Sequence, residues 1–180
     1  MKKKVIIGII VLIVLIGIVN SLSKHSQDKT TSEAANPTPT TAVTATPSYL
    51  TPQQTVKGLD TFFTLSKVGD VPGGIAWDGI NSETGTRVRV ITDKTQQDKV
   101  TTVMVWAKVS NDEAKDRVSL SILKTVAANT APDSIDWLNT AYATAVKSPG
   151  ENQEKTFGNK AISISYADLT GQLTFNEEVK

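Results

Sequence analysis

A run of apolar residues near the N-terminus constrains this chain more than any other feature. Three lysines at residues 2–4 precede 15 uninterrupted apolar or glycine residues at 5–19. The segment 5–22 would span ~27 Å as a helix at ~1.5 Å per residue, close to the ~30 Å hydrocarbon core of a bilayer. The sequence therefore predicts that residues 1–23 form a membrane anchor or a signal segment.

Two interpretations of this segment remain open. A cleaved signal peptide has an apolar run of about 7–15 residues, followed by small residues at the cleavage site. Here the run fills or exceeds that range, and the best available site, Ser21-Leu22-Ser23, lacks the alanines of a strong cleavage site. A retained single-span anchor fits these features better. Under either interpretation the three lysines stay in the cytoplasm, because basic residues favour that side.

We therefore expect the protein at the cell membrane. The N-terminus is cytoplasmic, the chain passes the membrane once, and the C-terminal domain is extracytoplasmic. If the segment is cleaved, the domain is secreted instead. The membrane is thus the first expected partner, through the N-terminal helix.

Residues 24–51 form a second unit, rich in Thr, Ser, Pro and Ala, as in Asn36-Pro37-Thr38-Pro39. Such a stretch buries too little apolar surface to offset the entropy lost on ordering, so we expect a disordered linker with polyproline II character. The linker would act as a spacer between the membrane and the domain. The same composition also permits an O-glycosylated stalk.

The remaining residues, 52–180, are enough for one domain with its own core, because a chain of that size buries about two thirds of its unfolded surface. The chain has no cysteine, which excludes disulfides, thiolate zinc sites, a thiol nucleophile and a lipoprotein anchor. From residue 51 onward there are 14 Lys and Arg and 16 Asp and Glu, a net charge of −2. No nucleic-acid partner is expected, because proteins that bind DNA or RNA carry a stripe of basic residues on their surface.

Periodic patterns predict the first elements of this domain. A capping threonine followed by Pro52 and Gln54 starts a helix that is expected to reach about Thr64. Alternation of apolar and polar residues predicts a half-buried strand at 86–92, and a second strand follows at 100–109 after a short polar turn. The second strand is apolar on both faces, which indicates a central position. The two strands should form an antiparallel hairpin.

The second half of the domain contains the patterns of two helices and further strands. Ser110 and Glu113 form a second capping box before a broad apolar helical face. Pro132 breaks the chain before a third helix. In order, we expect a helix at 51–64, a loop at 69–74, a short apolar piece at 75–77, strands at 86–92 and 100–109, helices at 110–127 and 135–146, and strands at 155–157, 160–166 and 173–175.

This order predicts an α+β fold. Strands that are grouped into hairpins, with helices bunched between the groups, form an antiparallel sheet with the helices on one face. We expect about five strands packed against two or three helices. The single transmembrane helix and the disordered linker precede this domain.

Acidic and histidine residues offer little chemistry. The one histidine, His25, lies in the linker, so a histidine-based acid–base or metal site in the domain is excluded. Asp112, Glu113 and Asp116 crowd the first turn of a predicted helix, where negative charge complements the helix dipole. We therefore predict no catalytic, cofactor-binding or metal-ligating residues and no cofactor.

Three acids in expected loops and three tryptophans keep other interpretations open. Asp78, Glu83 and Asp168 could serve a glycoside hydrolase if two of them were held several ångströms apart, but loop acids mostly form turns. Tryptophan packs in cores by default and is also enriched in binding hot spots. Of the three, at positions 77, 106 and 137, Trp106 and Trp137 lie off the main apolar stripes, so one of them could be exposed.

The predicted function is a non-enzymatic, membrane-anchored extracytoplasmic binding or interaction module of the bacterial cell envelope. Its partner would be a protein or a cell-wall component. One alternative is a cell-envelope hydrolase that uses the loop carboxylates. Another is a small subunit of an envelope machine for secretion, conjugation or phage exclusion.

Overall fold

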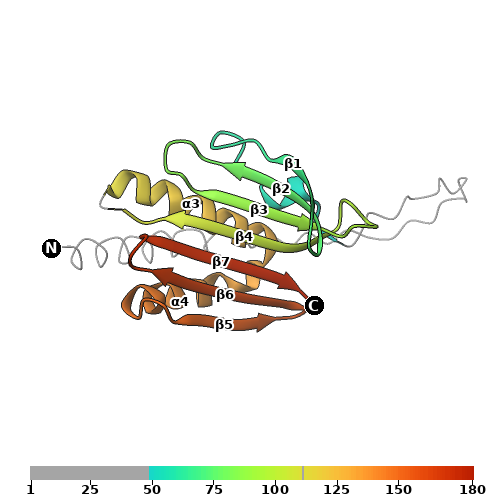
Figure 1. Ribbon diagram of the computed structural model, residues 1–180. Coiled ribbons are helices and arrows are strands. Elements are labelled where there is room, and N and C mark those ends of the chain that lie inside the picture. Colours follow the sequence, from blue (N-terminus) through green and yellow to red (C-terminus); the bar gives the residue numbers. More distant parts are fainter. Residues whose placement is uncertain (1–48, 111) are drawn as a thin grey trace, which may run out of the picture.

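The computed structural model describes residues 49–110 and 112–180 (Figure 1). The predicted anchor and all but the last three residues of the predicted linker lie outside the described residues, so both stay predictions. Within the part of the chain that is described, no helix is long and apolar enough to cross a membrane.

Seven antiparallel strands form one sheet in the order β1-β2-β3-β4-β7-β6-β5 (Figure 1). The strands are β1 (Ser66–Val71), β2 (Gly74–Ile80), β3 (Arg87–Thr92), β4 (Val100–Lys108), β5 (Asn152–Phe157), β6 (Lys160–Ala167) and β7 (Gln172–Val179). The helices are α2 (Pro52–Thr55), α3 (Glu113–Thr130) and α4 (Ile135–Lys147), with a 3-10 turn, η1 (Pro132–Ser134), between the last two. The expected α+β class is confirmed, and the expected count of about five strands is wrong.

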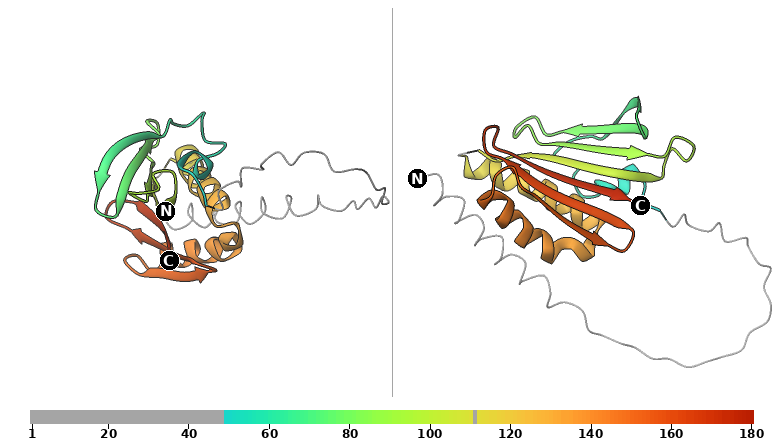
Figure 2. Two further views of the ribbon diagram at one scale, coloured as in Figure 1. Left: turned by 90° about the vertical axis from the view of Figure 1, so that its right-hand side faces the viewer. Right: turned by 60° about the horizontal axis from the view of Figure 1, so that its bottom comes forward.

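The three helices cover one face of the sheet, and the other face has no helix over it (Figure 2). Alternate residues of the central strands point to the helices, as strand geometry requires. These side chains form the core together with the apolar faces of α3 and α4. The strand residues of the core include Val88, Val90, Val103, Val105, Ala107, Ile162, Ile164, Leu173 and Phe175, and the helix residues include Ile122, Leu123, Val126, Leu138 and Ala145.

The predicted helix at 51–64 is largely wrong. The capping box forms as expected, with Gln54 N donating to Thr51 Oγ1 at 3.3 Å and Thr51 N donating to Gln54 Oε1 at 2.8 Å. The helix nevertheless ends after one turn at Thr55. Gly58 has a φ of 83°, a left-handed conformation that stops a helix. Leu59 nevertheless packs in the core. The apolar residues whose spacing suggested a helix therefore reach the core from successive turns of the chain.

The loop predicted at 69–74 belongs mostly to an edge strand and its hairpin turn. Val71 pairs with Gly74 across the β1–β2 turn, and the register shifts between Lys67 and Gly69. The shift marks a β-bulge, which inserts an extra residue and twists an edge strand away from its neighbour. Glycine and proline are signals of loops in a sequence, but here they form a tight hairpin and a bulge.

The other predicted elements are confirmed with small changes in their bounds. β3 and β4 form the expected hairpin, and β5 and β6 pair across Gly158-Asn159. The break before the third helix is the η1 turn at Pro132. The short apolar piece at 75–77 is the centre of β2, a full strand.

The helix α3 begins later than the predicted capping box. Asp112, not Ser110, is the N-cap, and its side chain accepts from Ala114 N at 3.1 Å and from Lys115 N at 3.3 Å. Ser110 lies instead in the connection between β4 and α3, where its N–H donates to Asp116 Oδ1 at 2.6 Å and the preceding Val109 donates its N–H to Gly171 O of the β6–β7 turn, also at 2.6 Å. The tertiary contact therefore delays the helix.

Residue 49 and Lys180 lie at the same end of the sheet (Figure 2). Val100 N donates to Leu50 O at 3.0 Å, and Lys180 N donates to Asn159 O at 2.8 Å. The opposite end holds the β2–β3 turn, the start of α3 and the β6–β7 turn, which Val109 fastens to β4. The chain thus enters and ends at one pole of the domain.

Candidate functional site

The uncovered face of the sheet brings together side chains from neighbouring strands. Arg87 pairs with Trp106 and Arg89 pairs with Met104 between β3 and β4. Residues directly opposite one another project to the same side of a sheet, and these four lie on the side away from the helices. We call Arg87, Arg89, Met104, Trp106 and Lys108 the Trp106 surface.

An ion pair fixes the centre of this surface. The Arg89 guanidinium donates to both carboxylate oxygens of Asp78 on β2, Nε to Oδ1 and Nη2 to Oδ2, each at 2.7 Å. These hydrogen bonds lower the pKa of Asp78 and raise the pKa of Arg89, although partial burial opposes both shifts. The guanidinium carbon also lies 6.0 Å from the centroid of the Trp106 ring, within range of a cation–π contact. Arg89 therefore links the acid to the indole.

Two further cations stand next to Trp106. Arg87 is directly opposite it on β3, and Lys108 is the next residue on the same side of β4. Both side chains are exposed, and within the described residues neither forms an ion pair. Their positive charge is thus open to solvent.

The part of the uncovered face beyond Trp106, on β7 and β6, is polar and made of small side chains, whereas the exposed Ile80 on β2 lies opposite Arg87. Trp106 pairs with Thr174 on β7, and Thr174 pairs with Ser165 on β6. Hydroxyl and amide side chains continue along β7 and β6 on the uncovered side. The acids on this side of the three strands are Glu178, near the end of β7, and Glu154 on β5. The residues concerned are Gln172, Thr174, Asn176 and Glu178 on β7, Ala161, Ser163, Ser165 and Ala167 on β6, and Glu154 on β5.

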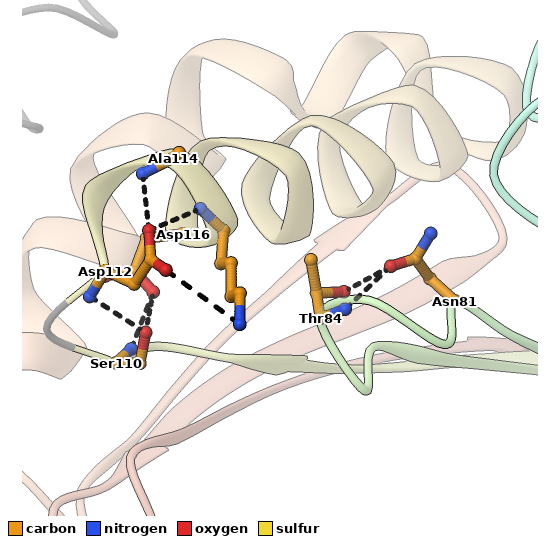
Figure 3. A network of polar contacts seen from close by, with 7 residues as sticks. Asn81, Thr84, Ser110, Asp112, Ala114 and Asp116 are labelled. Atoms are coloured by element: carbon orange, nitrogen blue, oxygen red, sulfur yellow. Dashed lines mark hydrogen bonds and ion pairs between the residues drawn. The ribbon is translucent and has the colours of Figure 1, made fainter.

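A hollow of about 430 Å³ lies at the end of the sheet, beside the start of α3, and adjoins the Trp106 surface at Lys108. Its lining residues are Glu83, Thr84, Lys108, Ser110, Asp112 and Lys115. Figure 3 shows that its polar groups are largely used by the fold: Asp112 caps α3 and lies 3.9 Å from Lys115 Nζ, and Ser110 Oγ donates to Asp116 at 2.9 Å. We therefore place the candidate site on the Trp106 surface and not in this hollow.

Near this hollow, a series of buried hydrogen bonds connects the β2–β3 turn to α3. Thr84 donates to Asn81 Oδ1 from both its N–H and its hydroxyl at 2.9 Å (Figure 3). Thr86 Oγ1 then donates to Ser119 Oγ on α3 at 2.9 Å. Buried polar groups need such partners, so this cluster is explained by stability.

The acids at the start of α3, expected to complement the helix dipole, take part in local contacts of the fold. Asp112 caps the helix, Glu113 pairs with Arg117 one turn on, and Asp116 is 1% exposed and accepts from Ser110. Within the described residues, no three His, Asp or Glu side chains gather in a way that could hold a metal ion.

The carboxylates singled out for hydrolysis are spread over the sheet. Asp78 was expected in a loop but lies on strand β2. Glu83 lies in the β2–β3 turn and Asp168 in the β6–β7 turn. Three strand spacings of ~4.8 Å separate these turns, or ~14 Å, which exceeds the ~5–10 Å between paired glycosidase carboxyls. The structure does not assemble them into one site.

The three tryptophans have different environments. Trp77 pairs with the buried Val90 and packs partly against the core. Trp137 also packs against the core, with its ring 5.7 Å from that of Phe157. Trp106, which is half-buried, lies on the uncovered face. The sequence signal for this surface was the alternation of Arg87 and Arg89, but the partners across β4 depend on register.

Comparison with protein-family models, with curated proteins and with solved structures finds no match.

Proposed function

We propose that this protein is a non-enzymatic, membrane-anchored extracytoplasmic module of the bacterial cell envelope that binds a partner on the Trp106 surface. The observation that carries this proposal is the uncovered sheet face, where an aromatic ring fixed by Arg89 and Asp78 stands among exposed cations. Tryptophan and arginine dominate binding hot spots because they combine a large apolar area with directed polar contacts.

The position of the tether supports this proposal. The predicted linker enters at the pole of residue 49, beside the β3–β4 turn. The Trp106 surface lies toward the other pole, where Lys108 ends β4. A linker of ~26 residues reaches between ~28 Å as a coil and ~80 Å when extended, so the face would be accessible at a distance from the membrane.

The chemistry of the acids favours binding over hydrolysis. A general acid must be protonated near neutral pH, which requires a raised pKa. Arg89 lowers the pKa of Asp78 instead, and the turns with Glu83 and Asp168 lie ~14 Å apart by strand spacing. The hydrolase alternative therefore gains no support. A subunit of an envelope machine would use the same surface for a neighbouring subunit.

The location can be tested with single cysteines, because the chain has none of its own. Glu154→Cys places a thiol on the exposed edge strand β5. In intact cells a membrane-impermeant maleimide should label it without permeabilisation. Intact mass of the membrane-fraction protein should retain the full 19.3 kDa, whereas cleavage near Ser23 removes more than about 2 kDa. Labelling only after permeabilisation would contradict the extracytoplasmic assignment.

Binding on the uncovered face can be tested by site-directed photo-crosslinking in intact cells. A benzophenone maleimide on Thr174→Cys, next to Trp106, should give a defined adduct. The matched control is Asp136→Cys, exposed on α4 on the helix side, and it should give none. Equal adducts from both positions, or none from Thr174→Cys, would count against a binding face here.

A further inference from the structure

We propose that the Trp106 surface binds a linear polymer of sugar or polyol units that carries phosphate or carboxylate groups. This inference rests on the proposed binding function and adds the chemical class of the partner. It is argued from the charges, the aromatic ring and the small polar side chains of one sheet face.

The aromatic ring supplies a rigid apolar platform. Trp106 is half-buried on the central strand β4, with Met104 beside it on the same side. The Arg89 guanidinium lies 6.0 Å from its centroid, and Asp78 holds that guanidinium in place at 2.7 Å. A platform that is already ordered loses little entropy on binding. The apolar C–H face of a sugar or polyol unit can pack on such a ring.

The charges next to the platform select an anion. Arg87 on β3 lies directly opposite Trp106 on β4. Lys108, two residues further along β4, is the diagonal neighbour of Arg87, about 7–8 Å from it at the backbone. Both are exposed, and neither has an ion-pair partner among the described residues. Asp78 on β2 is neutralised by Arg89, and Lys108 also borders the hollow that Glu83 and Asp112 line. Free cations of this kind complement phosphate or carboxylate groups, and arginine does so with two parallel hydrogen bonds.

The strands beyond Trp106 fit the uncharged part of such a polymer. Thr174 and Ser165 follow Trp106 across β7 and β6 in the same row. Their short hydroxyl side chains leave a low surface and can bond to sugar hydroxyls. The acids Glu178 and Glu154 stand on β7 and β5, away from the cations. The anionic groups are therefore expected over β3 and β4, with the neutral backbone over β7 and β6.

The experiment uses the full chain in detergent micelles. Isothermal titration calorimetry with polygalacturonate and with poly(glycerol phosphate) supplies carboxylate and phosphate probes, and dextran supplies the neutral control. Arg87→Gln and Lys108→Gln each remove one free cation. Lys57→Gln, an exposed lysine before the core residue Leu59 on the helix side, is the control for net charge.

The anionic probes should bind and dextran should bind at least tenfold more weakly. Arg87→Gln and Lys108→Gln should each weaken binding by about fivefold, as expected for one exposed charge contact, and should reduce its salt dependence. Trp106→Leu should weaken binding without changing the salt dependence, because it removes apolar contact and no charge. Lys57→Gln should bind like the unsubstituted protein, and thermal unfolding should confirm that all four variants fold.

Four results would overturn the inference. The first is no binding of either anionic probe. The second is an equal loss in Lys57→Gln and Arg87→Gln. The third is equally tight binding to vesicles of anionic lipid. The fourth is a disulfide between two copies through Thr174→Cys, which would make a second copy the occupant. If the anionic probes fail while Thr174→Cys still gives a specific adduct in cells, this inference is wrong and the proposed binding function stands.

Discussion

A buried ion pair between β6 and β7 allows a sharp prediction about stability. Lys160 Nζ lies 3.0 Å from Glu177 Oε1, and the side chains are 20% and 2% exposed, respectively. Thr130, the last residue of α3, donates its hydroxyl to Glu177 and offers its carbonyl to Lys160. The three groups therefore join the end of α3 to the sheet.

The two halves of the pair should differ when each is removed. Lys160→Met leaves the Glu177 carboxylate buried with one hydroxyl donor, and an uncompensated buried charge costs about 3–5 kcal/mol. Glu177→Gln leaves Lys160 partly in water and still bound to the Thr130 carbonyl, so the loss is about 1.5–3 kcal/mol, that of a hydrogen bond to a charged group. The double variant Lys160→Met/Glu177→Gln should be more stable than Lys160→Met alone, because it removes the buried charge.

Urea unfolding of residues 49–180, followed by circular dichroism at neutral pH, measures these differences. In thermal unfolding followed by the same signal, Lys160→Met should lower the melting temperature by roughly 12–20 °C, at ~4 °C per kcal/mol for a domain of this size. The control is Lys57→Met, an exposed lysine outside the sheet, which should change stability by less than about 0.5 kcal/mol. A loss in Lys160→Met no larger than that in Glu177→Gln would refute the argument from buried charge.

Three further predictions follow from single contacts. Gly171→Ala should cost about 3 kcal/mol or more by urea unfolding, whereas Gly158→Ala should cost only about 1 kcal/mol. The two glycines have similar φ angles, 61° and 59°. A Cβ at Gly171 would lie 2.3 Å from a main-chain oxygen, whereas a Cβ at Gly158 would meet nothing within 4 Å. Asp112→Ala removes the α3 cap and should cost about 1 kcal/mol, while a substitution by asparagine should restore most of it. Burial, with a contribution from Asp116, raises the pKa of Tyr142 from 10.0 to about 12. Because the folded state holds the phenol proton more tightly, this contribution to stability is complete below pH 10 and is lost as the pH rises to about 12, so Tyr142→Phe should remove the last step in a phenolate absorbance titration.

Local patterns of the sequence were sufficient for elements whose apolar period matches their structure. The hairpin of β3 and β4, the break at Pro132 and the helix α4 follow from alternation, a helix breaker and a 3.6-residue period. The division into helices on one face and an antiparallel sheet also follows from the order of these segments. The prediction failed for the segment before Ser66, because the spacing of apolar residues does not distinguish a helix from successive turns that pack against the same core.

The candidate site depended on tertiary structure. Alternation along β3 places Arg87 and Arg89 on one side, but it does not say what stands opposite them. Register across strands decides that Arg87 meets Trp106 and that Trp106 meets Thr174, which comes 68 positions later in the chain. Asp78 was predicted in a loop and proved to be the strand partner of Arg89.

The sequence by itself therefore determined the class of fold, most of the core and the absence of thiol chemistry. It also holds the anchor and linker patterns, on which the proposed location depends. Only the tertiary structure decided which polar residues meet on the uncovered face. The physical reason is that periodicity depends on neighbours along the chain, whereas pairing of β4 with β7 is a long-range contact that the packing of α3 and α4 on the shared core selects.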